Sequence, residues 1–555
     1  MKKLASLLLA LVMIMSCFSA MAATVENTTG HTYVAYQIFT GSQGTQSDNT
    51  AALGDIAWGN GINIDAFLTA LKADSRFNVT ITETPEGSET PVEKVVNIFD
   101  GCTTAIMVAD ALSKYGDNSD IAKAFADVAA DHRSTTSFEV PANGSETELP
   151  KGYYLIIDAS ELDQGDAYNA ALLQVEEDGN FTIAKKYDVP QVDKAVDQND
   201  VNIGDTVTFT LTAEMPDTFE GYKTYKVVFH DNLSKGLTFK NDIVVKVGDE
   251  VVTDKFTTAY TANEDGTTYI TITCNNILDF VDADDRIVVT YTATLNENAV
   301  IGGKGNPNSV YLEYSSNPNW TGDGIDNDND GETDEPGEDD EPTNTTPEDV
   351  VLVFTFELDV TKKDGETGAV LKDAKFKLYR EVAAAAGEGE DNTTGETNGT
   401  TTKEYVVVDE SNKVKNWTAN VDDASVLTSD EKGLFSVIGL DAGTYYLEEI
   451  QAPAGYNLLT APIKLVITAD YTEETGSWLT DDVTSLTVLT IVIDDGESTT
   501  GNLDDGSVAM TVNNMVGATL PETGGMGTTI LYVGGGILVL AAIVLLIVKR
   551  RASAE

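Results

Sequence analysis

The chain has 555 residues, which is enough for about three domains of ordinary size between its two ends. Its 91 acidic residues outnumber the 34 basic ones, and the formal net charge is −57. A surface this acidic repels phosphates, so nucleic acid is excluded as a partner. With three cysteines and three histidines in unrelated segments, neither a disulfide framework nor a catalytic triad or zinc site is expected. His31, His132 and His230 are interpreted as ordinary surface or strand residues.

The N-terminus has the pattern of a secretory signal peptide. Lys2 and Lys3 precede an apolar run over residues 4–15, and the small residues Ala20 and Ala22 fit the preference of signal peptidase. We therefore expect residues 1–22 to be removed during export. An exported chain without a disulfide framework must obtain covalent stability in another way.

Residues 23–189 combine two periodicities. Apolar residues at three- and four-residue spacing predict short amphipathic helices, near residues 65–72, 104–115 and 120–131. Alternating residues predict strands, at residues 33–40, 153–158 and 171–175. The segment is therefore expected to be an α+β domain dominated by its sheet, and Pro190 ends it with a short extended connector.

The rest of the exported chain alternates apolar and polar residues in short runs that turn residues bound. Such runs recur in residues 190–349, for example at 206–212, and again in residues 350–517, for example at 485–493. The pattern predicts two immunoglobulin-like β-sandwich domains in tandem. The expected fold class is therefore mainly β, with an α+β domain at the N-terminus.

Four aspartates lie at close spacing in the middle segment, namely Asp326, Asp328, Asp330 and Asp334. Gly331 lies among them and permits a turn, and alternating carboxylates can wrap a hard cation, so the segment resembles a calcium loop. The position that usually holds a bidentate glutamate is Gly337. A calcium (Ca²⁺) site and a solvated acidic linker therefore both stay open, and no cofactor is expected to be required.

The C-terminal residues 518–555 contain a motif, an apolar stretch and a basic tail, in that order. The motif LPETG consists of Leu520, Pro521, Glu522, Thr523 and Gly524, the uncharged stretch is 528–548, and the tail is Lys549, Arg550 and Arg551. The stretch has close to the roughly 20 residues that a transmembrane helix needs, and the tail predicts a cytoplasmic C-terminus. This order resembles the cell-wall sorting signal of sortase substrates of Gram-positive bacteria. The resemblance implies that a sortase cuts between Thr523 and Gly524 and passes the threonine carbonyl to an amine.

Residues 350–517 resemble the Cna B-type domain of pilins and adhesins. The resemblance rests on three stretches, LDVTKKD (358–364), YLEEIQAPAGY (446–456) and VNN (512–514). It implies that Lys362 and Asn514 join spontaneously through an isopeptide bond, with Glu449 assisting. Burial of a lysine together with a carboxylic acid favours the neutral form of both, and a neutral amine is the nucleophile that attack on an amide requires.

Strand parity selects these residues over their neighbours. Asn514 falls on the inward parity of the last strand, whereas Asn513 does not, and Glu448 likewise alternates away from Glu449. The family usually has threonine after the glutamate. This chain has Ile450 there, a departure that leaves the glutamate in place.

Residues 190–349 resemble the Cna A-type, or pilin middle, domain. Lys194 in VPQVDKAV, Asp231 in VVFHDNLSKGLTF and Asn308 in GNPNSVYLEYSSNP stand in the lysine, aspartate, asparagine order of that type. The resemblance implies a second isopeptide bond, from Lys194 to Asn308, with Asp231 assisting. Asn308 shares its parity with the apolar residues at 310 and 312, while Asn306 and Asn317 remain alternative partners.

The end of the first domain resembles that of backbone pilins. In that family a lysine in a motif resembling YPK attacks the sortase-bound threonine of the next subunit. The matching stretch is IAKKYDVP (183–190), where Lys186 takes the position of the lysine and Lys185 replaces the usual proline. Lys186 is therefore the expected polymerisation lysine, with Lys185 as the alternative. The opening strand has no lysine, so no internal bond is expected in this domain.

Together these resemblances identify the chain as a major (backbone) pilin, the fimbrial subunit of a sortase-polymerised, wall-anchored pilus that supports adhesion. The expected partners are sortase, further copies of the chain, peptidoglycan, ancillary pilins and a host ligand. The alternative is a wall-anchored adhesin or ancillary pilin that does not polymerise. No enzyme is expected, because no nucleophile, base and pocket motif occur together, and the only expected catalysis is autocatalytic isopeptide formation.

Overall fold

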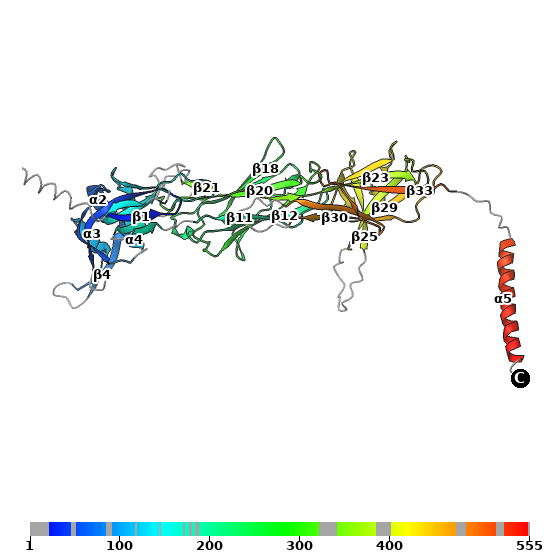
Figure 1. Ribbon diagram of the computed structural model, residues 1–555, viewed down its shortest axis with the longest axis horizontal. Coiled ribbons are helices and arrows are strands. Elements are labelled where there is room, and N and C mark those ends of the chain that lie inside the picture. The colour runs from blue at the N-terminus through cyan, green and yellow to red at the C-terminus, as the bar shows by residue number, and fades with distance from the viewer. Residues whose placement is uncertain are drawn as a thin grey trace, which may run out of the picture. The chain divides into compact units, whose positions relative to one another are not determined.

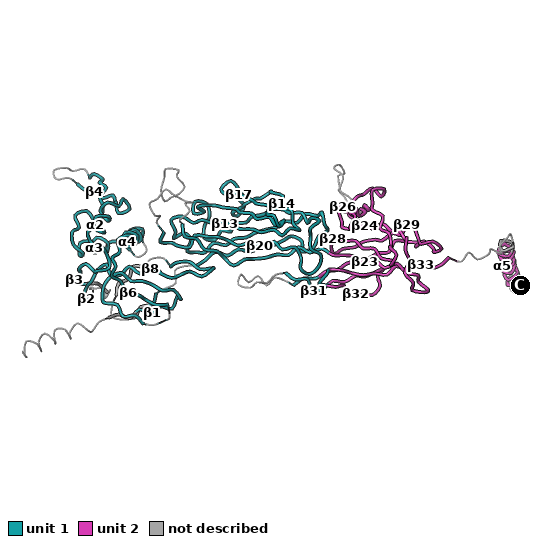
Figure 2. The backbone as a smooth tube through the Cα atoms, turned by 90° about the horizontal axis from the view of Figure 1, so that it is seen from above, with its two compact units in different colours: residues 1–355, 470–488, 503–505 teal, residues 356–469, 489–502, 506–555 magenta. Residues whose placement is uncertain are grey.

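The computed structural model describes residues 22–45, 51–84, 91–116, 119–142, 144, 146–169, 172–176, 180–183, 188–320, 341–383, 401–472, 484–517 and 527–552. These residues form two compact units (Figure 2). Unit 1 comprises residues 1–355, 470–488 and 503–505, and unit 2 comprises residues 356–469, 489–502 and 506–555. The segments predicted as the first and second domains both lie in unit 1.

The N-terminal part of unit 1 combines sheets and helices, as predicted (Figure 1). One sheet has the order β3-β2-β8-β9 with β6 against β2, another has the order β10-β1-β7, and β4 and β5 form a hairpin. Their bounds are β1 Ala22–Asn27, β2 Tyr33–Thr45, β3 Ala51–Trp58, β4 Asn78–Glu83, β5 Val92–Asn97, β6 Phe138–Val140, β7 Thr147–Pro150, β8 Gly152–Asp158, β9 Leu172–Glu176 and β10 Asn180–Ile183. The helices are α2 Ile64–Ala73, α3 Ala105–Leu112, α4 Asp120–Asp131 and the short 3₁₀ helix η1 Ser75–Phe77.

The three α-helices lie where the apolar spacing predicts them, and two of them, α2 and α4, pack through aromatic side chains. Phe67 of α2 and Phe125 of α4 are fully buried, and their rings meet edge to face with centroids 5.4 Å apart. The side chain of Ser119 accepts a hydrogen bond from the backbone N–H of Ala122 and so caps the N-terminus of α4.

The middle part of the chain is a sandwich of two antiparallel sheets. The first sheet has the order β11-β12-β19-β15-β16 with β14 against β19, and the second has the order β17-β18-β13-β20-β21 with β22 against β20. Their bounds are β11 Gln191–Val196, β12 Thr206–Glu214, β13 Val227–Leu233, β14 Leu237–Phe239, β15 Val244–Val247, β16 Glu250–Val251, β17 Thr257–Ala262, β18 Thr268–Cys274, β19 Arg286–Leu295, β20 Asn306–Ser315, β21 Thr343–Thr345 and β22 Asp349–Val353. Every second residue of β12 and β19 is buried, so one face of their sheet forms the core.

The strands between residues 356 and 514 form two sheets. The smaller has the order β28-β23-β33, and the larger has the order β26-β25-β24-β29-β30-β31-β32 with β27 against β24. Their bounds are β23 Phe356–Asp364, β24 Lys375–Ala383, β25 Thr401–Val408, β26 Val414–Thr418, β27 Leu427–Thr428, β28 Leu434–Leu440, β29 Gly443–Gln451, β30 Ile463–Tyr471, β31 Leu486–Ile493, β32 Thr499–Thr500 and β33 Ser507–Asn514. β23 and β33 run parallel and alternate buried with accessible residues, as the sequence pattern predicts.

A helix, α5 (Gly527–Ala552), covers the stretch where the sequence predicts a transmembrane helix at residues 528–548. Within the part of the chain that the structure describes, no helix is both long and apolar enough to cross a membrane. The transmembrane part of the predicted fold is therefore not confirmed, whereas the mainly β architecture with an α+β segment is.

Candidate functional site

The middle sandwich buries a lysine, an aspartate and an asparagine together in its core. Lys194 lies on β11 of one sheet, whereas Asp231 on β13 and Asn308 on β20 belong to the other sheet. All three residues are fully buried. Asp231 pairs with Val310, two residues from Asn308, so the aspartate and the asparagine share the inward face of their sheet.

Tyr291 on β19 connects the three side chains. Nζ of Lys194 donates a hydrogen bond to the carboxylate of Asp231 and another, 3.3 Å long, to the hydroxyl oxygen of Tyr291. This hydroxyl donates to Oδ1 of Asp231 at 2.9 Å and accepts from Nδ2 of Asn308 at 2.7 Å. Among the described residues, the buried Oδ1 of Asn308 finds no hydrogen-bond partner. A single hydroxyl group therefore separates the lysine amine from an asparagine amide whose oxygen is unsatisfied.

Burial moves both members of the lysine–aspartate pair toward their neutral forms. Removal from water lowers the pKa of Lys194 and raises the pKa of Asp231, and their mutual attraction only partly opposes each shift. Burial also raises the pKa of Tyr291 well above its usual value, so its hydroxyl keeps its proton. The ring centroid of Phe209 lies 5.5 Å from Nζ of Lys194, which helps to keep the amine dry. The site thus favours an uncharged, nucleophilic amine.

The alternative asparagines of this segment are engaged elsewhere. The side chain of Asn306 donates to the carbonyls of Val300 and Val353, both at 3.0 Å, and accepts from the N–H of Val300 at 2.8 Å. Asn317 accepts a hydrogen bond from the N–H of Asn319. Of the three candidates, Asn308 is the one whose amide contacts Tyr291 in the lysine cluster.

A second cluster, of a lysine, a glutamate and an asparagine, lies in unit 2. Lys362 on β23 pairs with Val512 on the parallel strand β33, so Asn514, two residues further on, lies on the same face of the sheet. Nδ2 of Asn514 donates to both carboxylate oxygens of Glu449 on β29, at 2.9 and 3.0 Å. The buried Oδ1 of Asn514, like that of Asn308, lacks a hydrogen-bond partner within the described residues.

Additional contacts hold the unit 2 cluster in place. The carbonyl of Asn457 accepts from Nδ2 of Asn514 at 2.9 Å, and the N–H of Leu459 donates to Oε2 of Glu449 at 2.9 Å. Nζ of Lys362 donates to the carbonyl of Val512 at 3.1 Å. Burial lowers the pKa of Lys362 to about 8, although nearby carboxylates partly oppose the shift. Lys362 therefore becomes a neutral amine at a lower pH than an exposed lysine does.

Parity also places the neighbouring residues as predicted. Asn513 is exposed whereas Asn514 is buried, and Glu448 is half-buried whereas Glu449 is buried. Tyr291 of the middle cluster is not among the site residues predicted from the sequence. The available signal was its inward parity on β19, since a buried tyrosine hydroxyl needs a hydrogen-bond partner.

Three groups of predicted site residues lie outside the described residues. They are Lys186 with its alternative Lys185, the sorting motif at 520–524, and the aspartates Asp326, Asp328, Asp330 and Asp334. Within the described ranges, no group of three or more histidine, cysteine, aspartate or glutamate side chains is arranged to hold a metal ion. The polymerisation lysine and the calcium site therefore stay predictions.

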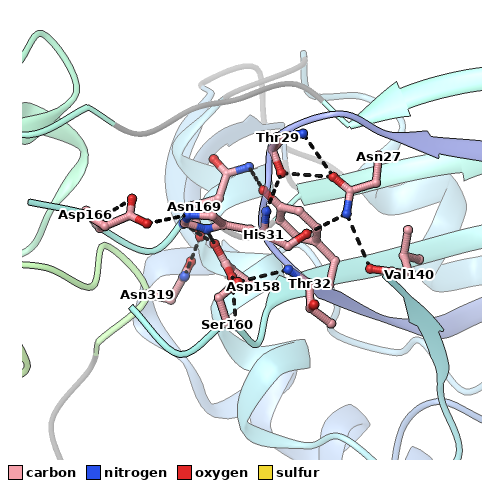
Figure 3. Close-up of polar contacts among 12 residues, drawn as sticks. Asn27, Thr29, His31, Thr32, Val140, Asp158, Ser160, Asp166, Asn169 and Asn319 are labelled. Carbon is pink, nitrogen blue, oxygen red and sulfur yellow. Dashed lines mark hydrogen bonds and ion pairs between the residues drawn. The ribbon is translucent and has the colours of Figure 1, made fainter. Parts of the chain in front are cut away.

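The interpretation of the histidines as ordinary surface or strand residues is wrong for His31, which is buried beneath a polar network (Figure 3). Nδ1 of His31 lies 2.5 Å from Oδ2 of Asp158, and its Nε2 lies 2.9 Å from Oδ2 of Asp166. The N–H of Asn169 also donates to Asp158, at 2.8 Å. Both ring nitrogens of His31 thus face carboxylates, and that of Asp158 is buried.

We expect His31→Leu to lower the free energy of unfolding of the N-terminal segment by about 1–3 kcal/mol, because it leaves the buried carboxylate of Asp158 without its histidine partner. Hydrogen exchange at β2 and β8 during denaturant titration measures the loss. His132→Leu is the matched control, since His132 is only partly buried and bonds to one backbone carbonyl, that of Val128. Equal effects of the two substitutions would contradict the role of the carboxylates.

Three family models match parts of the chain. They are described as a Gram-positive pilin backbone subunit 2, Cna-B-like domain (residues 203–318), a prealbumin-like fold domain (residues 356–478) and an LPXTG cell wall anchor motif (residues 516–555). The first of these describes the middle domain as Cna-B-like, a different subclass from the Cna A-type assigned from the sequence.

One similar characterised protein is the trypsin-resistant surface T6 protein of Streptococcus pyogenes serotype M6. It is 25% identical over 329 residues, which are 55% of this chain and 49% of that protein, so the chain matches about half the length of this relative. Similar solved structures include the pilus 2b backbone protein of group B streptococcus, with 24% identity over 59% of this chain and 99% of that one and a TM-score of 0.38. Another is the T6 backbone pilin of serotype M6 Streptococcus pyogenes, with 17% identity over 89% of this chain and 98% of that one and a TM-score of 0.47.

The family models, together with the fold, define the class of protein. The chain carries an LPXTG cell wall anchor motif and a prealbumin-like fold domain, and it is a cell-wall surface protein of Gram-positive type. More narrowly, residues 203–318 match the model of a Gram-positive pilin backbone domain, in agreement with the resemblance to pilins that the sequence shows.

Proposed function

We propose that the chain is the backbone subunit of a sortase-polymerised pilus, in which an intramolecular isopeptide bond closes each of the two β-sandwiches. The matches to a pilin backbone domain and to an anchor motif support the proposal. The observation that carries it is the pair of buried clusters. In each cluster, a lysine on the first strand of a sandwich lies with an acid and an asparagine from later strands.

The reaction at each cluster exchanges one amide for another. The neutral Nζ of the lysine attacks Cγ of the asparagine, the Nζ–Cγ bond forms, the Cγ–Nδ2 bond breaks, and ammonia leaves. One proton lost by the amine ends on the leaving nitrogen, and the nearby carboxylic acid carries it between them. Asp231 and Glu449 are the acids that hydrogen bond within the two clusters.

The two isopeptide bonds would supply the covalent stability that disulfides supply in many other exported proteins. They close loops of 115 residues (194–308) and 153 residues (362–514), counting both ends. On the chain-entropy model used for disulfides, each closure stabilises its domain by roughly 5 kcal/mol. In unit 2 the bond joins two paired parallel strands, β23 and β33, so a pulling force would bypass their hydrogen bonds.

Assembly would use the sorting motif and the end of the first domain. A sortase would cleave after Thr523 and transfer its carbonyl to Lys186 of another copy, and the last subunit would be joined to peptidoglycan. Ancillary pilins and a host ligand would bind the finished fibre. Wall extracts boiled in detergent are expected to show a ladder of covalent polymers, and a single monomer band would favour the wall-anchored adhesin instead.

The unit 2 bond is expected to form faster as the pH rises toward 8 and to level off above it. In the folded, unreacted chain the pKa of Lys362 is about 8, so its amine changes from mostly charged below that pH to mostly neutral above it. The neutral fraction, and with it the rate, should rise about tenfold between pH 7 and pH 9. Intact mass followed over time after cell-free synthesis measures the rate. A rate that falls over this interval would contradict attack by a neutral amine.

A further inference from the structure

Tyr291 is the one residue of the middle cluster that contacts all three other members through a single atom. Its hydroxyl oxygen lies 3.3 Å from Nζ of Lys194, 2.9 Å from Oδ1 of Asp231 and 2.7 Å from Nδ2 of Asn308. The side chain is 1% exposed. One donated and two accepted hydrogen bonds use the full capacity of a phenolic hydroxyl. Its neighbours are therefore the nucleophile, the acid and the leaving group of the proposed reaction.

In the unit 2 cluster, the acid contacts the asparagine amide directly. There the carboxylate of Glu449 accepts directly from Nδ2 of Asn514, at 2.9 and 3.0 Å. Asp231 has a side chain shorter by one methylene, and within the described residues its carboxylate hydrogen bonds to Lys194 and Tyr291 but not to Asn308. The hydroxyl of Tyr291 occupies the gap between the aspartate and the leaving nitrogen.

We propose that Tyr291 is a catalytic residue of isopeptide formation in the middle domain, where it relays the proton from Asp231 to the leaving nitrogen of Asn308. This inference rests on the proposed isopeptide bond. Nζ of Lys194 forms its bond to Cγ of Asn308, and as Cγ becomes tetrahedral Nδ2 gains a lone pair, toward which the O–H of Tyr291 turns from Asp231. The tyrosine proton moves to Nδ2 while the carboxyl proton of Asp231 moves to the tyrosine oxygen, and Asp231 then takes up the proton that Nζ loses. The Cγ–Nδ2 bond then breaks and ammonia leaves, with Tyr291 and Asp231 restored to their starting forms.

The surroundings of Tyr291 suit a relay that never releases its proton to solvent. Burial raises the pKa of the hydroxyl well above its usual value, so a free phenolate is disfavoured and the two proton movements must be concerted. Each of the four side chains of the cluster is at most 1% exposed, so none of them lies at the solvent-facing surface. Phenylalanine would fill nearly the same space, so a purely structural role would require only the ring.

The test compares three variants of the full chain after cell-free synthesis, with loss of ammonia resolved for each domain by mass spectrometry of proteolytic fragments. Tyr291→Phe is expected to slow bond formation in the middle domain by about 100-fold, the lower range for removal of a general acid–base group. The unit 2 bond in the same molecules should form at its normal rate. Tyr314→Phe is the matched control, since Tyr314 is also fully buried but donates to the carbonyl of Asp166 at 2.8 Å.

A rescue separates the relay from a structural role. Asp231→Glu, introduced together with Tyr291→Phe, extends the acid by one methylene toward Asn308 and recreates the direct contact of the unit 2 cluster. The double variant should form the middle-domain bond at least tenfold faster than Tyr291→Phe alone. A merely structural defect would not be repaired by a longer acid. A Tyr291→Phe chain that reacts as fast as the parent would overturn the relay, and so would a double variant no faster than Tyr291→Phe alone. A parent chain that never loses ammonia from the middle domain would instead overturn the proposed bond itself.

Discussion

Asp231→Ala and Glu449→Ala are each expected to prevent one isopeptide bond, so that each variant loses one ammonia where the parent chain loses two. Each substitution removes the acid that carries the proton, so the neighbouring lysine no longer displaces the asparagine amide. Relative to the mass calculated from its own sequence, the exported parent should lack two ammonia molecules, each single variant one, and the double variant none. Intact mass of the purified chain measures this. A parent mass equal to the unmodified sequence would contradict both bonds.

The same variants should lose thermal stability in the affected domain only. Loss of a closure worth roughly 5 kcal/mol is comparable to the whole stability of an ordinary domain and should lower its unfolding temperature by about 10–20 °C. Calorimetry resolves which transition moves. Glu448→Ala is the matched control for Glu449→Ala, because Glu448 is only half-buried and its side chain alternates away from the cluster. It should leave both the bond and the transition unchanged.

Lys186→Ala is expected to abolish polymers while monomer remains attached to the wall. A sortase acyl-enzyme at Thr523 needs an accessible amine, and the sequence places Lys186 at the end of the first domain. The reference pKa of lysine is near ~10.4, so the sortase must supply the base and the recognition. Immunoblots of boiled wall extracts measure the outcome.

Two companion variants make this result specific. Lys185→Ala, one residue away, should keep the ladder, whereas Thr523→Ala should lose both the ladder and the wall-attached monomer. A ladder that persists in Lys186→Ala and disappears in Lys185→Ala would assign the acceptor to Lys185.

The sequence predicts those parts of the sites that depend on local chain direction. Alternation along a strand separates Asn514 from Asn513 and Glu449 from Glu448, because successive residues point to opposite faces whatever the strand pairs with. Apolar spacing likewise predicts the three α-helices of the first domain. These features need no knowledge of which strands are neighbours.

Contacts that depend on the register of distant strands were not predicted. Tyr291 reaches its hydrogen-bond partners across 97 residues to Lys194 and 60 residues to Asp231, and His31 reaches Asp158 across 127 residues. Each is one polar residue in an otherwise unremarkable run, and only the pairing of the sheets brings its partners near. The contact between Asp231 and Tyr291 in the middle cluster therefore could not be predicted from the sequence alone.

In the proposed pilus, copies of this chain are joined head to tail into a covalent fibre. Mass spectrometry of proteolysed wall polymers tests it most directly, through the branched peptide that carries the junction. We expect a peptide in which the carbonyl of Thr523 is joined to Nζ of Lys186. If Thr523 is found joined to peptidoglycan alone, with no junction to any lysine of another copy, the chain is a wall-anchored adhesin and not a pilus backbone.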